Sequence, residues 1–184
     1  MAPAGNFECL HAAIQGGADS VYFGVEKLNM RSHSANNFRM EELGEICRIC
    51  HEAGVKAYLT LNIVLYGDEL ETMRHTLDAA LAAGVDAVIA SDMAAIIYAR
   101  SIGLDVHIST QLSISNAEAL RFYSQWADVV VLARELNLSQ VREIKDIIER
   151  DNICGPSGRR VGIEMFAHGA LCMAISGKCY LSLH

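Results

Sequence analysis

The sequence has few prolines and no long apolar run. Only two prolines occur among 184 residues, so no proline-rich linker divides the chain. No uncharged apolar stretch reaches the ~18 residues that a membrane helix needs, and no basic-then-apolar leader opens the chain. We therefore expect neither a membrane span nor a signal peptide, and a cytoplasmic location. The formal net charge of −7 disfavours a broad basic face for nucleic acid.

Aromatic residues are also scarce, at 7% against 52% hydrophobic residues overall, so the core is aliphatic. A chain of this length normally forms one domain with a sizeable core. Six cysteines without a secretory signal indicate a reducing compartment, where thiols are free, catalytic or metal-bound.

Short apolar runs alternate with amphipathic stretches along the chain. The helical spacing between runs is clear where Leu43, Ile46, Cys47 and Cys50 share one face, and again where Leu70, Met73, Leu77 and Leu81 do. The opening MAPAG adds the end of a further strand, with Asn6 capping the helix that follows. This alternation predicts βαβ units and a parallel sheet with about seven βα steps. The apolar runs cover residues 18–25, 54–63, 84–92, 103–111, 127–135 and 159–168.

A doubly wound sheet or a (β/α) barrel would accommodate these steps, and the polarity of the strand ends favours the barrel. Enzymes of the barrel architecture place their chemistry at the C-terminal ends of the strands. A single polar residue there also simply marks where a strand enters a loop. We predict an α/β fold, a parallel TIM-barrel-like (β/α) barrel that is incomplete. The polar strand ends are Asn62, Asp92, Ser109 with Gln111, Arg134 with Glu135, and Glu164 with His168.

Strand alternation places ionisable groups on one face. In the last run, Glu164, Phe166 and His168 oppose Ile163 and Met165, so they would look into the barrel. An inward carboxylate and imidazole form either a buried polar pair or an acid–base pair. The run 103–111 places a second set on one face: His107, Ser109 and Gln111.

The cysteines fall into two groups. Cys47-Arg-Ile-Cys50-His51 matches the C-x-x-C-H pattern of haem attachment, but both thiols lie on the apolar face of a predicted helix. We therefore predict buried core residues without haem, and we expect the same of Cys9 on the first helix.

Cys172 and Cys179 differ, because they lie in a segment spaced by Gly169 and Gly177. Thiolates on such a loop suit zinc or an iron–sulfur cluster, which usually need four. The other ligands would come from a longer protein or a second chain, or the two cysteines are structural.

The stretch EMFAHGALCMAISGKCYLS, residues 164–182, closely resembles the signature of peptidase family U32, whose members are labelled collagenase-like peptidases. The resemblance extends along the whole chain through APAGNFECLHAAIQGGADSVYFG, LNMRSHSANNF, LTLNI, HISTQLSISN and VVLAREL. It implies a barrel-like N-terminal domain followed by further segments. It also implies O2-independent hydroxylation of tRNA, rRNA or a quinone precursor. In several such proteins a 4Fe–4S cluster is held by four cysteines, and prephenate is the apparent oxygen source.

By this resemblance Cys172 and Cys179 match the first two cluster ligands, and the other two would lie beyond residue 184. We therefore expect residues 1–184 to be a single truncated domain, without the C-terminal family segments and without a complete cluster of its own. Glu164 and His168 would position substrate or move protons, and Arg134 would hold a carboxylate by a paired hydrogen bond. A prephenate-like small molecule is the expected co-substrate. The expected pocket residues are Asn37, Asn62, Asp92, His107, Gln111 and Glu135.

Two other functions stay open. A peptidase needs an activated nucleophile or a water-activating metal, but the chain has no G-x-S-x-G and no H-E-x-x-H, and only Cys172 with His168 resembles a thiol–imidazole pair. The third hypothesis is a non-catalytic fragment that binds a partner. Because an incomplete barrel leaves unpaired strand edges, we also expect self-association or a C-terminal segment that covers the edge.

Overall fold

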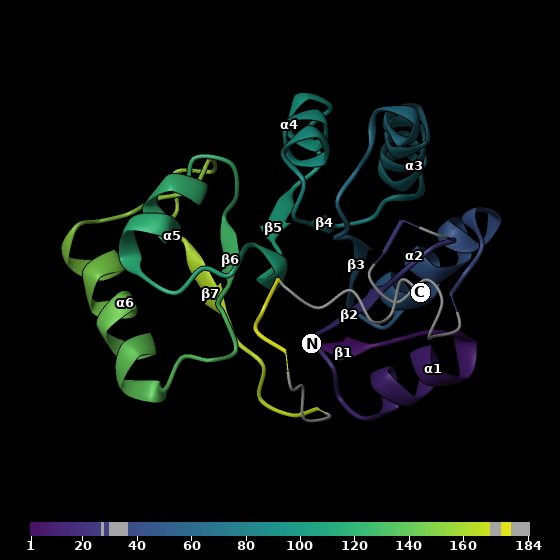
Figure 1. Ribbon diagram of the computed structural model, residues 1–184. Coiled ribbons are helices and arrows are strands. Elements are labelled where there is room, and N and C mark those ends of the chain that lie inside the picture. Colours follow the sequence, from purple (N-terminus) through teal and green to yellow (C-terminus); the bar gives the residue numbers. More distant parts are fainter. Residues whose placement is uncertain (27, 30–36, 170–173, 178–184) are drawn as a thin grey trace. The chain divides into compact units, whose positions relative to one another are not determined.

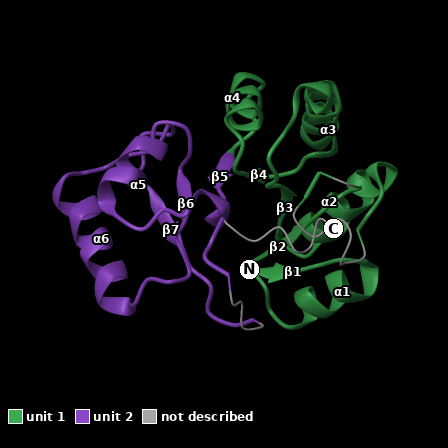
Figure 2. Ribbon diagram, in the orientation of Figure 1, with its two compact units in different colours: residues 1–105, 180–184 green, residues 106–179 purple. Residues whose placement is uncertain are grey.

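The computed structural model describes residues 1–26, 28–29, 37–169 and 174–177 (Figure 1). The chain divides into two compact units, the first over Met1–Asp105 and the second beginning at Val106 (Figure 2). Strands alternate with helices in both units, and within each unit neighbouring strands pair in chain order, β1 to β4 in the first and β5 to β7 in the second.

The first unit is a parallel sheet whose strands are joined by helices. Each strand from β1 to β3 pairs in parallel with the next. Val21 of β2 pairs with Ala57 of β3, and Leu59 of β3 pairs with Val88 of β4. Its elements are β1 (Ala2–Pro3), α1 (Phe7–Gln15), β2 (Ser20–Phe23), η1 (Met40–Glu42), α2 (Leu43–Glu52), β3 (Lys56–Leu61), η2 (Gly67–Glu69), α3 (Leu70–Ala83), β4 (Ala87–Ala90) and α4 (Met93–Ser101).

Local sequence sets the helix ends in this unit. Asn6 accepts a hydrogen bond from the Cys9 N–H at 2.8 Å and caps α1, as its position predicts. Asp92 caps α4 in the same way, through the Ala94 N–H. Gly84 ends α3 in the left-handed region, at φ 84°, where a residue without Cβ is least strained.

The core of the first unit is aliphatic. The strand residues Val21, Leu59 and Val88, for example, are fully buried. The predicted buried face of α2 is confirmed, because Leu43, Ile46, Cys47 and Cys50 are all at most 2% exposed.

Two expectations for helix faces are wrong. Cys9 is exposed, because α1 turns Leu10 rather than Cys9 into the core. On α3 the small side chain of Ala80 is fully buried, whereas Leu81 is 41% exposed.

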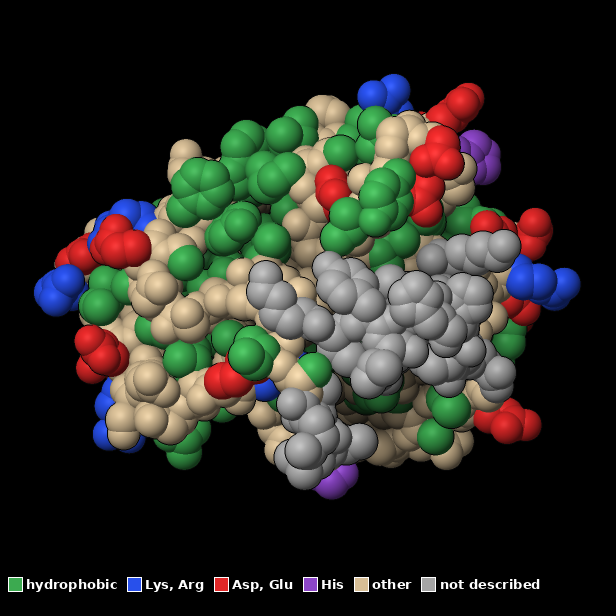
Figure 3. All heavy atoms as spheres, in the orientation of Figure 1, with side chains coloured by type: hydrophobic (Ala, Val, Ile, Leu, Met, Phe, Trp, Pro, Cys, Tyr) green, Lys and Arg blue, Asp and Glu red, His purple; other side chains and the backbone are tan. Residues whose placement is uncertain are grey.

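The second unit repeats the parallel pattern with three strands. His107 pairs with Val129 and Val129 pairs with Gly162, while Val131 pairs with Glu164. Acidic and basic side chains lie side by side over α6, at the left edge of Figure 3. The elements are β5 (Val106–Ile108), η3 (Thr110–Leu112), α5 (Ala117–Tyr123), β6 (Val129–Val131), α6 (Leu138–Arg150) and β7 (Gly162–Glu164).

The last strand is shorter than the run 159–168 that predicted it. The Val161 N–H donates a hydrogen bond to the Ile153 carbonyl, and Cys154 and Arg160 form an antiparallel bridge. Residues 159–161 therefore pair with the preceding loop and not with β6. At the other end, the Glu164 carbonyl accepts the Leu132 N–H, after which residues 165–169 are exposed. The period-two alternation of a strand therefore extends to Glu164 but not to His168.

The predicted fold class is confirmed, since parallel strands in seven steps alternate with helices. Over the described ranges, no helix is both long enough and apolar enough to cross a bilayer.

The buried thiols of α2 give a testable expectation. Burial is the main cause that raises the pKa of Cys47 to about 12 and that of Cys50 to about 11. In the native protein at mildly alkaline pH, both should resist iodoacetamide while the exposed Cys9 is alkylated, because only thiolates react. Mass spectrometry of tryptic peptides measures this, with urea-unfolded protein as the control. Equal labelling of Cys9 and Cys47 in the native state would contradict the core assignment.

Candidate functional site at the strand ends of the second unit

An imidazole and a carboxylate meet on one face of the second sheet. His107 is buried in β5, and Glu164 is the last residue of β7. Because His107 is in register with Gly162, Glu164 lies two residues further along on the same face. The His107 Nδ1 lies 3.5 Å from the Glu164 Oε1, a contact that becomes an ion pair when the imidazole is protonated.

The second oxygen of Glu164 is buried and accepts no hydrogen bond from any described residue. A buried carboxylate oxygen without a donor is costly, and in native proteins it often marks a functional group. Glu164 therefore has acceptor capacity beyond its contact with His107. The pair has the composition that proton transfer requires.

Arg134 follows β6 and is held by a serine from a distant segment. Both its backbone N–H and its Nε donate to the Ser176 Oγ, at 3.2 and 3.3 Å. The guanidinium carbon lies 5.8 Å from the centroid of the Phe166 ring, a cation–π distance. Arg134 forms no ion pair with a carboxylate of the described residues. Its terminal N–H groups are therefore suited to an anion or to a carbonyl oxygen.

Ser176 is the anchor of this arrangement and is fully buried. Its N–H donates to the Glu135 Oε1 at 2.6 Å, and its carbonyl accepts the Ser113 hydroxyl. Gly177 follows at φ 73°, and a Cβ there would meet the Gln111 carbonyl oxygen and lie 2.7 Å from the Ser113 Oγ. The short described segment 174–177 thus packs closely on the residues that follow β5 and β6.

Ser176 is a site residue that the sequence pattern did not predict, although the neighbouring Gly177 stood out in it. The only signal was position, because Ser176 lies between the two cysteines of the family-like signature. Cys172 and Cys179 themselves lie outside the described residues. The described part of the chain contains no group of three or more His, Cys, Asp or Glu side chains that is arranged to hold a metal ion.

Not every predicted residue joins this site. His168 lies beyond the end of β7 and is exposed, so it is His107 that the structure brings to Glu164. Gln111 contributes through its backbone, since its N–H donates to the Ser109 Oγ and its carbonyl faces Gly177.

The remaining predicted residues belong to the first unit. Asp92 has a structural task, because its two oxygens accept the N–H groups of Ala94 and Leu65 at 2.8 and 3.2 Å. The Asn37 Oδ1 accepts a hydrogen bond from the buried Asn29 at 3.2 Å. Asn62 is half-buried directly after β3.

Comparison with known proteins identifies relatives along the whole chain. The model of peptidase family U32 matches residues 5–184. A collagenase of Porphyromonas gingivalis is 66% identical over 184 residues, covering 100% of this chain and 44% of that protein. The tRNA hydroxylation protein P1 of Bacillus subtilis is 37% identical, covering 100% of this chain and 42% of that protein.

A third relative is named for the modification of ribosomal RNA. The 23S rRNA 5-hydroxycytidine C2501 synthase of Escherichia coli is 36% identical over 183 residues, covering 99% of this chain and 26% of that protein. The chain thus spans less than half the length of these relatives.

A solved structure has the same fold. The U32 peptidase Mk0906 is similar with a TM-score of 0.67 and 18% identity, covering 89% of this chain and 65% of that one.

The Glu135–Ser176 contact generates a pH-dependent prediction. The Ser176 backbone N–H is the largest cause that lowers the pKa of Glu135 below its ordinary 4.5. Because the folded pKa is lowered, the stabilisation is present above the ordinary value and is lost as pH falls through the lowered one. The Ser176 amide should therefore be protected from hydrogen exchange at neutral pH and lose protection in acid, after correction for intrinsic rates.

The matched variant is Glu135→Gln, which should show weaker protection that no longer changes with pH in the acidic range. Glu143→Gln, at an exposed position of α6, is the control and should behave as the unaltered chain. The prediction is wrong if Glu135→Gln and Glu143→Gln show the same pH dependence of Ser176 amide protection.

Proposed function

Because the chain belongs to peptidase family U32, we propose that it is part of an O2-independent hydroxylation protein that modifies RNA. The supporting observation is that relatives named for tRNA and rRNA hydroxylation align with 99% or more of the chain. The aligned stretch includes the positions of Glu164, His107 and Arg134.

In this proposal the chain's own residues bind substrate and handle a proton. Glu164 and His107 hold or transfer a proton beside the reacting nucleobase, since imidazole and carboxylate side chains are common general acids and bases. The guanidinium of Arg134 binds the carboxylate of a prephenate-like co-substrate with its terminal N–H donors. Ser176 fixes the direction of that guanidinium through Nε.

The cofactor of the proposal is a 4Fe–4S cluster with Cys172 and Cys179 as two of its usual four thiolates. When bound, such a cluster supplies one-electron transfer. Two observations on the described residues support Cys172 and Cys179, rather than Cys47 and Cys50, as the cluster ligands. The buried anchor Ser176 lies in the sequence between the two cysteines, and the raised pKa values of Cys47 and Cys50 make both thiols poor ligands.

A peptidase is the second candidate, and the 66% identity to a protein named collagenase favours it. The geometry gives it less support. Ser176 is fully buried and its hydroxyl accepts from Arg134, while the hydroxyl of Ser109 accepts the Gln111 N–H. Neither serine is in a described contact with His107, which a nucleophile and its base would require.

The activity test is nucleoside analysis. The gene product that contains residues 1–184 is expressed in a bacterium that lacks its own tRNA hydroxylation protein, and its tRNA and rRNA are digested. We expect one nucleoside to gain the mass of a single oxygen by mass spectrometry. Glu164→Gln should lower its yield about 100-fold, whereas Glu143→Gln should leave it unchanged.

Glu164→Gln keeps the size of the side chain, so an unchanged melting temperature would show that the loss is chemical. Cleavage of gelatin by the same protein, without any modified nucleoside, would refute the hydroxylation proposal and favour the peptidase.

The cofactor test is anaerobic reconstitution of the same gene product with iron and sulfide. We expect bound iron and a broad visible absorption from thiolate-to-iron charge transfer. Cys172→Ser and Cys179→Ser should each abolish both signals, and Cys9→Ser, at an exposed cysteine of α1, should retain them. Full iron loading of the Cys172→Ser protein would show that the ligand assignment is wrong.

A further inference from the structure

Arg134 and Phe166 form a half-exposed stack at the strand ends of the second unit. The guanidinium carbon lies 5.8 Å from the ring centroid, and Phe166 is 49% exposed. Tyr66 and Phe122 are also exposed, at 69% and 55%, but among the described residues only Phe166 and Tyr98 lie under an arginine guanidinium. The exposed part of the Phe166 ring, with the cation beside it, offers a flat apolar surface on which a ligand can stack.

The guanidinium of this stack is fixed in direction. Its Nε donates to the Ser176 Oγ at 3.3 Å, and Ser176 is fully buried. Ser176 is itself held by Glu135 and Ser113. A planar group that is already oriented loses little conformational entropy when a second planar group stacks on it.

Arg134 forms no ion pair with a carboxylate of the described residues, although the neighbouring Glu135 interacts with it electrostatically. By contrast, Arg121 and Arg150 both pair with Asp151, each at 2.7 Å. The flat faces of the guanidinium and of the Phe166 ring match a ligand with a flat π-surface. The terminal N–H groups lie at the edge of the guanidinium, so stacking on its face leaves them to the co-substrate carboxylate.

We infer that Phe166 and Arg134 form a stacking platform for one unpaired nucleobase of an RNA substrate. The choice of RNA over other flat ligands rests on the function proposed above. Unpaired bases stack on aromatic rings and on guanidinium planes.

The net charge of −7 does not favour a long phosphate track, so a single splayed-out base fits this chain better than a duplex backbone. Phe166 follows Glu164 by two residues, which brings the platform close to the proposed proton-transfer pair.

The experiment compares ligands that differ only in the base. The gene product that contains residues 1–184 is titrated by NMR with each of the four nucleoside 5′-monophosphates and with ribose 5-phosphate. We expect at least one nucleotide to bind about tenfold more tightly than ribose 5-phosphate, because base–aromatic stacking contributes that much. Phe166→Leu should remove this preference, and Phe166→Trp should retain it.

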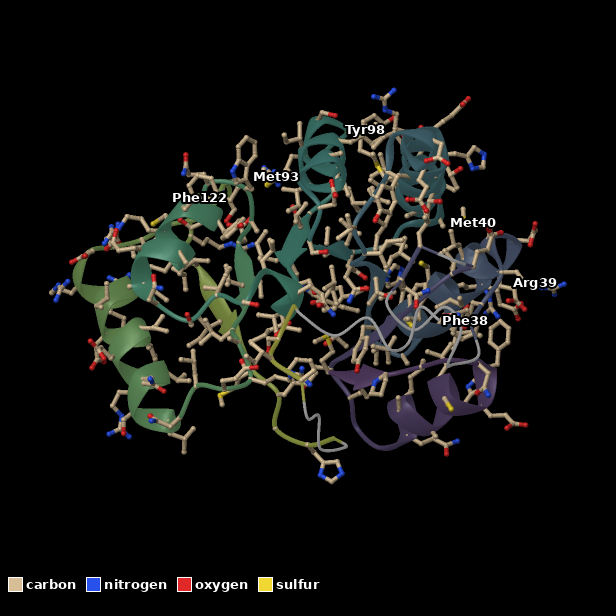
Figure 4. All side chains as sticks on the ribbon, viewed as in Figure 1. Phe38, Arg39, Met40, Met93, Tyr98 and Phe122 are labelled. Atoms are coloured by element: carbon tan, nitrogen blue, oxygen red, sulfur yellow. The ribbon has the colours of Figure 1, made fainter. Side chains whose placement is uncertain are left out.

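Arg134→Lys tests the second half of the platform, since lysine keeps the charge but loses the plane. It should weaken nucleotide binding and leave ribose 5-phosphate binding nearly unchanged. The matched control is Phe122→Leu, at a phenylalanine of α5 (Figure 4) whose side chain is 55% exposed. This substitution should not affect the preference. Melting temperatures of all variants exclude unfolding as the cause.

Equal affinity for nucleotides and ribose 5-phosphate would overturn the inference, as would a preference that survives in Phe166→Leu. Binding of a gelatin peptide that Phe166→Leu weakens, with no nucleotide preference, would assign the platform to a peptide instead. Base preference that depends on Phe166, in a protein that yields no hydroxylated nucleoside, would support the platform while refuting the proposed function.

Discussion

The hydrogen bonds of one buried serine hold the candidate site together. Ser176 uses its hydroxyl, its N–H and its carbonyl at once, and the partners come from the residues that follow β5 and β6. A fully buried polar residue is stable only when its donors and acceptors are satisfied. The direction of Arg134, and with it the stack on Phe166, depends on this anchor.

Charge and burial divide the tasks among the polar strand ends. Where both oxygens of a carboxylate accept backbone N–H groups, as in Asp92, the side chain maintains the fold. Where an oxygen is buried without a donor from the described residues, as in Glu164, the side chain has capacity left for chemistry. Both are acidic residues at or just after the end of a strand, so the local sequence pattern does not separate them, whereas their hydrogen-bond partners do.

Much of the fold could be predicted from periodicity, because burial of an apolar face imposes a fixed spacing on each element. The buried face of α2 and the Asn6 cap follow from a few neighbouring residues. The site was only partly predictable. Glu164 was recognised, but its partner is His107 rather than His168, because the strand ends at Glu164 and the alternation ends with it.

The sequence by itself determined the alternation of strands and helices, the aliphatic core and the family signature, since all three depend on the order of side chains along the chain. Only the tertiary structure decided which distant residues meet. Ser176 reaches Arg134 across 42 positions, and no local pattern encodes such a contact. Its physical reason is register, because strand pairing and the close approach at Gly177 fix which backbone groups face one another.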